Sequence, residues 1–159
     1  GPGSFTSLRI GLALVKGMAL ALHLPVVSLP TLDILAAGQA LQDLPLAVVL
    51  QAGRGRLAVG WYQNNGLKWE SQGKAEVVTI QQLSTRIQRP TLVCGELNAE
   101  ERQILQRKRK NVLLASPAEC VRRPAWLAEL GWKRWQAGQL EDPVSLSPIY
   151  LHVAEEIPQ

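Results

Sequence analysis

The residues with the clearest chemical potential lie in the opening segment "GPGSFTS", residues 1–7. Gly1, Gly3, Ser4 and Thr6 come directly before a segment with helical periodicity, and the free N–H groups of a helix N-terminus favour an anion. The segment matches neither GxxxxGK[ST] nor GxGxxG, since no lysine follows the second glycine at the required place. Phosphate binding by these four residues is therefore the minority interpretation, and a tightly packed turn explains the same glycines.

Other groups suited to catalysis are sparse. His23 and His152 stand in unrelated segments, so no metal ion is expected. No GxSxG segment marks a serine nucleophile, and Cys94 ends an apolar segment, where a buried and inert thiol is expected. We therefore expect no catalytic residue. Because Cys94 and Cys120 lack CxxC spacing and no secretory signal is recognisable, the expected compartment is the reducing cytoplasm.

The net charge of +4 comes largely from one run, "RQILQRKRK", residues 102–110. Such a run is usually the solvated face of a helix. The alternative is direct RNA binding through residues 107–110 together with Arg122 and Arg123. No aromatic residue interrupts the run, so its sequence gives no sign of base stacking.

Residues 5–22 are predicted to form one helix, capped by Ser4 or Thr6 and ended before Pro25. Large apolar residues and small residues form two neighbouring stripes at a spacing of four, and only Arg9 and Lys16 are charged. A helix that is apolar nearly all round must be covered on more than one side, by its own sheet and by something else. Arg9 and Lys16 divide the apolar segment, so no membrane span is expected.

The remaining pattern alternates strands with helices, which predicts an α/β domain. Residues 46–50 and 57–62 read as a hairpin around Gly53 and Gly55, and residues 64–74 as a turn-rich connection. Further strands are expected at 25–30, 76–79, 90–95 and 111–115, with helices at 31–41 capped by Thr31, after residue 79, at 98–110 capped by Asn98, and from Pro124. The last of these should pack its apolar side, formed by Trp126, Leu127, Leu130 and Trp135.

The segment "GPGSFTSLRIGLALVKGMALALHLPVVSLPTLDILA" resembles the bacterial TsaB (YeaZ) family, whose signature is close to GPGSFTGLRIG followed by a similar apolar segment. The stretch "VVLQAGRGRLAVGWY" is similar to the family's "DARRGEVY" hairpin, and the closing "WLAELGWKRWQAGQLEDPVSLSPIYLH" to its last helix and tail. Three positions depart from the family pattern: Ser7 replaces a glycine, Gln51 an aspartate and His152 an arginine.

The resemblance implies an α/β fold of the actin/Hsp70/sugar-kinase (ASKHA) type, here the end of lobe one followed by lobe two. Family members carry strands and a helix ahead of the glycine segment, so we expect the N-terminal part to be incomplete and the chain to self-associate. The expected division is 1–44 for the remainder of the first lobe, 45–147 for the second lobe and 148–159 for the tail.

The function implied by the resemblance is that of a non-catalytic scaffold in the synthesis of N6-threonylcarbamoyladenosine at position 37 of tRNAs. Its partners would be TsaD and the ATPase TsaE, with a homodimer in isolation, tRNA contacted indirectly, and no cofactor of its own beyond ATP or ADP in the assembled complex. The first helix would supply the interface, formed by Phe5, Arg9, Ala13, Leu14, Gly17, Met18 and Ala21. The alternative is a nucleotide-binding or hydrolytic enzyme that holds phosphate at residues 1–6.

Overall fold

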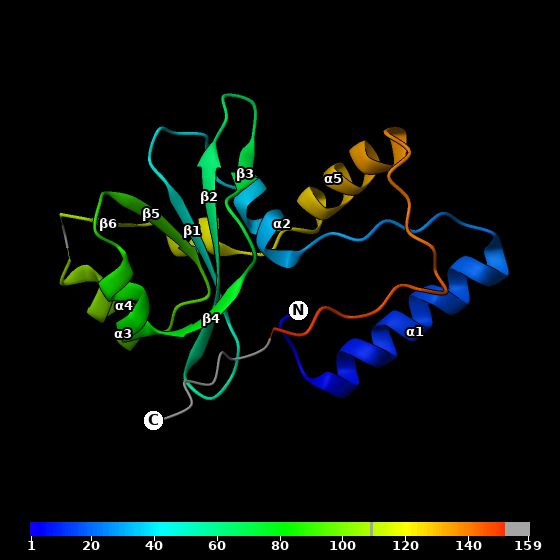
Figure 1. Cartoon of the computed structure of the whole chain (residues 1–159), viewed down its shortest axis with the longest axis horizontal. Coiled ribbons are helices and arrows are strands. Elements are labelled where there is room, and N and C mark those ends of the chain that lie inside the picture. Colours follow the sequence, from blue (N-terminus) through cyan, green and yellow to red (C-terminus); the bar gives the residue numbers. More distant parts are fainter. Residues whose placement is uncertain (109, 152–159) are drawn as a thin grey trace.

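The structure is a computed structural model that describes residues 1–108 and 110–151. One mixed sheet of six strands forms its centre, in the order β3-β2-β1-β5-β6, with β4 also paired to β2 (Figure 1). β1 (Leu46–Gln51) and β2 (Arg56–Asn64) are antiparallel, as the hairpin prediction requires. β5 (Thr91–Gly95) and β6 (Val112–Leu114) extend the sheet in parallel from β1. The α/β prediction is confirmed.

Two short strands share the outer edge of β2. β4 (Glu76–Thr79) pairs with its first half, as a strand there was expected. β3 (Trp69–Ser71) pairs with its second half and was missed, because the surrounding asparagines and glycine read as a turn. Trp69 explains the strand: its side chain is buried, and its indole nitrogen donates a 3.1 Å hydrogen bond to the carbonyl of Gln39.

Alternation along β1 builds two cores, one on each face of the sheet. Leu46, Val48 and Leu50 face α2 (Thr31–Ala37), and α5 (Pro124–Gln136) packs against α2 on that side. Ala47 and Val49 face α3 (Ile80–Arg86) and α4 (Ala99–Gln106). All five of these strand residues are fully buried. A Pro117–Cys120 turn of 3-10 helix, η1, follows β6.

α4 begins after its predicted cap residue, and α3 begins directly after residue 79, as expected. Asn98 caps α4 in a reciprocal pair with Glu101, and Thr79 caps α3 in the same way with Gln82. The Thr31 cap is wrong. Pro30 occupies the cap position of α2, and Thr31 Oγ1 instead accepts a 3.1 Å hydrogen bond from Gly1 N. α2 also ends at Ala37, earlier than expected, and the chain then turns towards β1.

The strand expected at residues 25–30 is reduced to a single bridge between Val26 and Glu141. Pro25 and Pro30 have no N–H to donate to a neighbouring strand, and the sheet ladders do not include this segment. The segment instead links α1 (Phe5–Leu22) to the sheet domain. Arg134 on α5 holds it in place with a 2.6 Å hydrogen bond to the carbonyl of Ser28.

Candidate partner-binding surface

Helix α1 stands away from the sheet, beside the C-terminal tail (Figure 1). Its bounds agree with the prediction, and Ser4 caps it by accepting a 3.1 Å hydrogen bond from the Ser7 amide. Only Ala19 is buried. The expectation that the sheet of this chain covers one face of the helix is therefore wrong, because the link through residues 23–30 carries α1 beyond the reach of the sheet.

The tail covers one side of α1. Tyr150 stacks on Phe5 with ring centroids 5.4 Å apart, and its hydroxyl accepts a 3.1 Å hydrogen bond from Arg9 Nε. The Arg9 guanidinium also lies 3.9 Å above the Phe5 ring. Lys16 Nζ donates to the carbonyl of Val144 at 3.0 Å. Both charged residues of the helix are thus used by the chain itself, on the same side.

The opposite side of α1 is apolar and uncharged, and nothing in the described part of the chain covers it. Ile10, Leu14 and Met18, spaced four residues apart, are 65%, 64% and 53% exposed. Beside them run Ala13, Gly17 and Ala21, which are exposed as well. A methyl group added at Gly17 would meet nothing within 4 Å, so no contact within the described chain requires a small residue there. We call this side, from Ile10 to Leu22, the open face of α1.

The seven residues predicted as the interface therefore separate into two groups. Phe5 and Arg9 contact the tail, whereas Ala13, Leu14, Gly17, Met18 and Ala21 lie on the open face. Sequence periodicity placed these five together correctly. It could not reveal the tail contacts, because Tyr150 is 141 residues from Arg9 along the chain.

The opening turn holds the start of α1. Ser4 Oγ accepts from the Ser7 amide and donates a 2.7 Å hydrogen bond to Ser7 Oγ, so Ser4 caps the helix and Ser7 Oγ is its side-chain partner. Ser7, which replaces the glycine of the family pattern, therefore has a hydrogen-bonding role at the start of α1. A methyl group at Gly1 or Gly3 would make only ordinary contacts, with the Leu8 side chain at 3.6 Å and, from Gly1, with the Gly3 backbone nitrogen at 4.0 Å. Tight packing within the described chain therefore does not explain these glycines.

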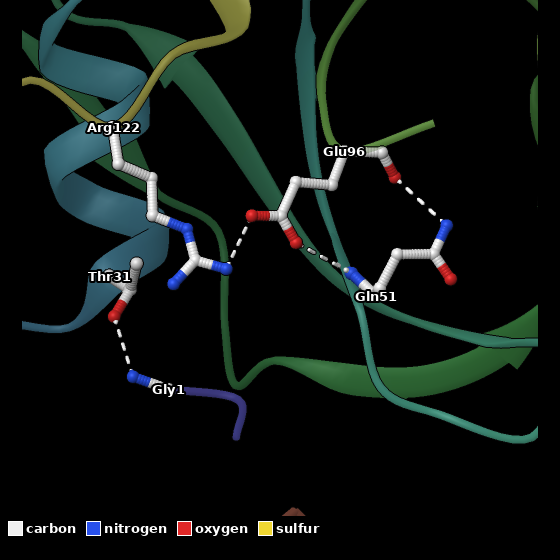
Figure 2. A network of polar contacts seen from close by, with 5 residues as sticks. All are labelled: Gly1, Thr31, Gln51, Glu96 and Arg122. Carbon is white, nitrogen blue, oxygen red and sulfur yellow. Dashed lines mark hydrogen bonds and ion pairs between the residues drawn. The ribbon is translucent and has the colours of Figure 1, made fainter. Parts of the chain in front are cut away.

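A polar network lies near this turn, at the carboxyl ends of β1 and β5 (Figure 2). Glu96 forms an ion pair with Arg122 and accepts a 3.2 Å hydrogen bond from the Gln51 amide. The Gln51 side chain donates both to the carbonyl of Glu96, at 3.2 Å, and to Glu101 Oε2, at 2.7 Å. Sequence reasoning singled out Gln51 as a departure but missed Glu96 and Glu101, whose roles depend on strand order.

Other residues with titratable side chains do not take part in this network. Cys94 is buried in the core, and burial raises the pKa of its thiol to about 12. Burial likewise raises the pKa of Tyr62, whose hydroxyl donates to Asp33 at 2.7 Å. His23 ends α1 with φ of 53°, and His152 lies outside the described residues. Within the described ranges, no group of three or more potential ligand side chains could hold a metal ion.

The side of α5 expected to pack is only half covered. Trp126 and Leu130 are half-buried, whereas Leu127 and Trp135 are 47% and 44% exposed. Trp135 pairs instead with Trp132, their ring centroids 4.7 Å apart. The expectation of a buried aromatic face is wrong because α5 contacts α2 rather than lying directly on the sheet.

By length and composition, α1 also meets the criteria for a helix able to cross a membrane, with a mean hydropathy of 1.5 over its 18 residues. The division by Arg9 and Lys16 argued against such a span in the sequence. Core helices and signal sequences meet the same criteria. The hydropathy of α1 therefore does not show whether lipid or another protein covers the open face.

Comparison with known proteins gives consistent results. The family model described as "TsaD: tRNA N6-adenosine threonylcarbamoyltransferase" matches residues 1–113. The chain is 31% identical over 163 residues to the tRNA threonylcarbamoyladenosine biosynthesis protein TsaB of Bacillus subtilis, covering 98% of this chain and 68% of that protein. TsaB of Buchnera aphidicola is 28% identical over 92 residues, which cover 56% of this chain and 44% of that protein.

Two solved structures share the fold. One, YeaZ from Pseudomonas aeruginosa, has a TM-score of 0.72 at 24% identity and covers 95% of this chain and 71% of its own. The other, from the same organism, is described as an uncharacterized protein with similarity to peptidase YEAZ. It has a TM-score of 0.73 at 23% identity and covers 96% of this chain and 70% of its own.

The fold and the open face define an α/β protein with a mixed sheet and one helix whose open face no described residue covers. The comparisons then give the family. The chain belongs to the TsaB/YeaZ family, within the TsaD/glycoprotease family.

Proposed function

We propose that this chain is a non-catalytic scaffold subunit in the synthesis of N6-threonylcarbamoyladenosine at position 37 of tRNAs. Family membership supports the pathway, since two related proteins are named for this biosynthesis. We further propose a cytoplasmic location, with TsaD as the partner at α1, TsaE as a further member of the complex, and a homodimer when TsaD is absent.

The open face of α1 is the observation that carries this proposal. Its apolar side chains are about half or more exposed, while both charges of the helix are used on the tail side. A continuous apolar face of this kind marks a protein or membrane contact. A stripe of small residues beside a stripe of large ones also offers a groove for the large residues of a facing helix.

We also propose the ASKHA arrangement for the whole chain, with residues 1–44 as the end of the first lobe, 45–147 as the second lobe and 148–159 as the tail. The separation of α1 from the sheet supports a boundary after this helix (Figure 1). In contrast, α2 contributes Leu32, Leu35 and Ala36 to the core on one face of the sheet. Packing alone would therefore place residues 31–44 with the second lobe.

Single charges on the open face test the proposal. Gly17→Glu and Ala21→Glu should each weaken self-association at least tenfold, measured by sedimentation velocity over a concentration series, because pairing would bury an unpaired carboxylate. Circular dichroism should show that the sheet domain stays folded. Ala125→Glu, on the exposed start of α5, is the matched control and should associate like the wild type.

The same variants should lose binding to the TsaD protein of the source organism in a titration with purified components. Unchanged sedimentation and unchanged TsaD binding for both charge variants would contradict the proposed interface. Wild-type chain that sediments as a monomer at every concentration and also fails to bind TsaD would contradict the scaffold function itself.

The second candidate is a nucleotide-binding or hydrolytic enzyme that uses Gly1, Gly3, Ser4 and Thr6 for phosphate. The match to a transferase family model over residues 1–113 is the reason to consider this candidate. Two of its features are already engaged within the chain, since Ser4 caps α1 and Gly1 N donates to Thr31. Calorimetry with ATP and ADP separates the candidates: saturable heat that Ser4→Ala reduces would support the enzyme, and its absence would support the scaffold.

A further inference from the structure

The amino ends of β1 and β5 border a hollow of about 320 Å³, and no residue of α1 lines it. Pro45, Trp61, Arg86 and Arg89 line it together with the backbone between Ile87 and Thr91. Its volume lies at the lower end of the range for small-molecule sites. Neither the proposed scaffold role nor the polar network at the opposite ends of these strands uses it.

Two of the residues that line this hollow are basic, and a second basic segment lies close to them in space. Arg86 and Arg89 come from the end of α3 and the turn after it, and Arg107, Lys108 and Lys110 follow α4. Arg86, Arg89, Arg107 and Lys110 are exposed. Arg86 pairs with Glu76, whereas among the described residues Arg89, Arg107 and Lys110 have no carboxylate within ion-pair distance. In the segment that contributes Pro45 to the lining, the nearest acidic residue in sequence is Asp43, two positions before Pro45.

Hydrogen bonds tie the two basic segments together. Asn111 Nδ2 donates to the carbonyl of Gln88 at 3.0 Å, and the Thr91 amide donates to the carbonyl of Asn111 at 3.0 Å. Lys108 Nζ donates to the carbonyl of Ser84, in α3. The basic run therefore lies beside the turn that carries Arg89, and Figure 1 shows α3, α4 and β6 together at one end of the sheet. We call this group of residues the basic edge.

Trp61 adds an aromatic surface to the basic edge. Its indole nitrogen donates a 3.0 Å hydrogen bond to Glu76 Oε1, the carboxylate that also pairs with Arg86. This contact fixes the ring at the lining of the hollow, where it is half-buried. The sequence of the basic run contains no aromatic residue, so base stacking was not expected there. The missing aromatic group comes from β2, through the folding of the sheet.

The other two arginines considered for RNA binding do not belong to this group. Arg122 forms an ion pair with Glu96, just beyond the carboxyl end of β5, and Arg123 donates to the carbonyl of Ala118 at 3.1 Å. The basic edge lies at the amino end of the same strand. The early hypothesis of one RNA surface joining residues 107–110 with Arg122 and Arg123 is therefore replaced.

We propose that the basic edge is a direct RNA-binding surface, at which Arg89, Arg107 and Lys110 contact phosphates and Trp61 stacks on an unpaired base. Guanidinium and ammonium groups beside an accessible aromatic ring are the combination that binds single-stranded segments of RNA, and the half-buried Trp61 ring reaches solvent through the hollow that it lines. An acidic protein surface would use the charges but would leave the ring without a partner. The proposal is independent of the open face of α1.

Fluorescence anisotropy with a labelled RNA hairpin that has a single-stranded loop tests this surface. The double variant Arg89→Glu/Arg107→Glu should bind at least tenfold more weakly than the full wild-type chain. Its slope of log K against log salt should fall by about 0.7 to 0.9 for each phosphate contact removed. Trp61→Phe should weaken binding about threefold or more, with little change in that slope, because stacking rather than charge is reduced.

The matched control is Lys68→Glu/Lys74→Glu, which makes the same change of net charge at exposed positions between β2 and β4. It should retain most of the affinity. Equal losses in the two double variants would show a net-charge effect and overturn the proposal, as would a hairpin that the wild-type chain does not bind. The Gly17→Glu variant should bind the hairpin normally, so a failure here is distinguishable from failure of the scaffold proposal.

Discussion

Gln51 shows how the role of one residue depends on its neighbours in space. Its carboxamide donates a 2.7 Å hydrogen bond to a carboxylate oxygen of Glu101, a residue that is only 5% exposed. That same oxygen accepts a hydrogen bond from the backbone amide of Asn98, which completes the cap of α4. An aspartate, which the family resemblance places at position 51, has no hydrogen to donate at neutral pH. Gln51 is therefore suited to this buried acidic partner.

The thiol of Cys94 gives a prediction at the same scale. Burial raises its pKa from 9.0 to about 12, so at pH 8 only about one thiol in ten thousand is ionised in the folded chain. Cys120 is half-buried. Ellman's reagent at pH 8 should therefore titrate one thiol rapidly in native protein and two in guanidinium chloride.

The raised pKa of Cys94 also makes the free energy of unfolding depend on pH. Below pH 9 the Cys94 thiol is protonated in both the folded and the unfolded chain, so it does not affect the pH dependence of unfolding. Between pH 9 and about 12 the unfolded chain ionises first, and the free energy of unfolding should fall. Cys94→Ala should remove this part of the decline, and two thiols that react equally fast in the native state would contradict the assignment.

Among the elements, the contact between β5 and β1 depends on one glycine. Gly95 has φ of 118°, and a methyl group there would lie 2.0 Å from the carbonyl oxygen of Val49. Gly95→Ala should therefore lower the free energy of unfolding by about 3 kcal/mol or more, measured by urea denaturation.

A second glycine, Gly73, allows the cost of the steric clash at position 95 to be distinguished from the cost of backbone strain. Gly73 has φ of 133° with no atom near its methyl position, so Gly73→Ala should show only the strain, about 1 to 2 kcal/mol. A Gly95→Ala variant no less stable than Gly73→Ala would show that β5 can move away from Val49.

Elements whose signals are local were predictable from the sequence. The bounds of α1, the hairpin, and the caps of α3 and α4 follow from periodicity and capping residues within a few positions of each other. The short strand at Trp69, the isolated bridge at Val26 and the exposure of α5 depend on which distant element lies alongside. The open face was predictable as an apolar stripe, whereas the basic edge needed Trp61 and Arg89 brought together from separate elements.

At the scale of the whole molecule, the sheet domain and α1 differ in what stabilises them. The sheet has a buried core on both faces, whereas α1 buries only Ala19 and touches mainly the tail. An isolated helix of this length is marginal in water, and most helical stability in proteins comes from packing of an apolar face. The order of α1 should therefore depend on association, while the order of the sheet should not.

Dilution of the wild-type chain should then lower helix content without unfolding the sheet. Far-UV ellipticity per residue at 222 nm should weaken as the proposed homodimer dissociates, while the near-UV signal of the buried Trp69 region stays constant. Gly17→Glu should show the diluted spectrum at all concentrations, and Ala125→Glu should follow the wild type. Ellipticity that stays constant while sedimentation shows dissociation would mean that the tail contacts of Phe5, Arg9 and Lys16 alone keep α1 helical.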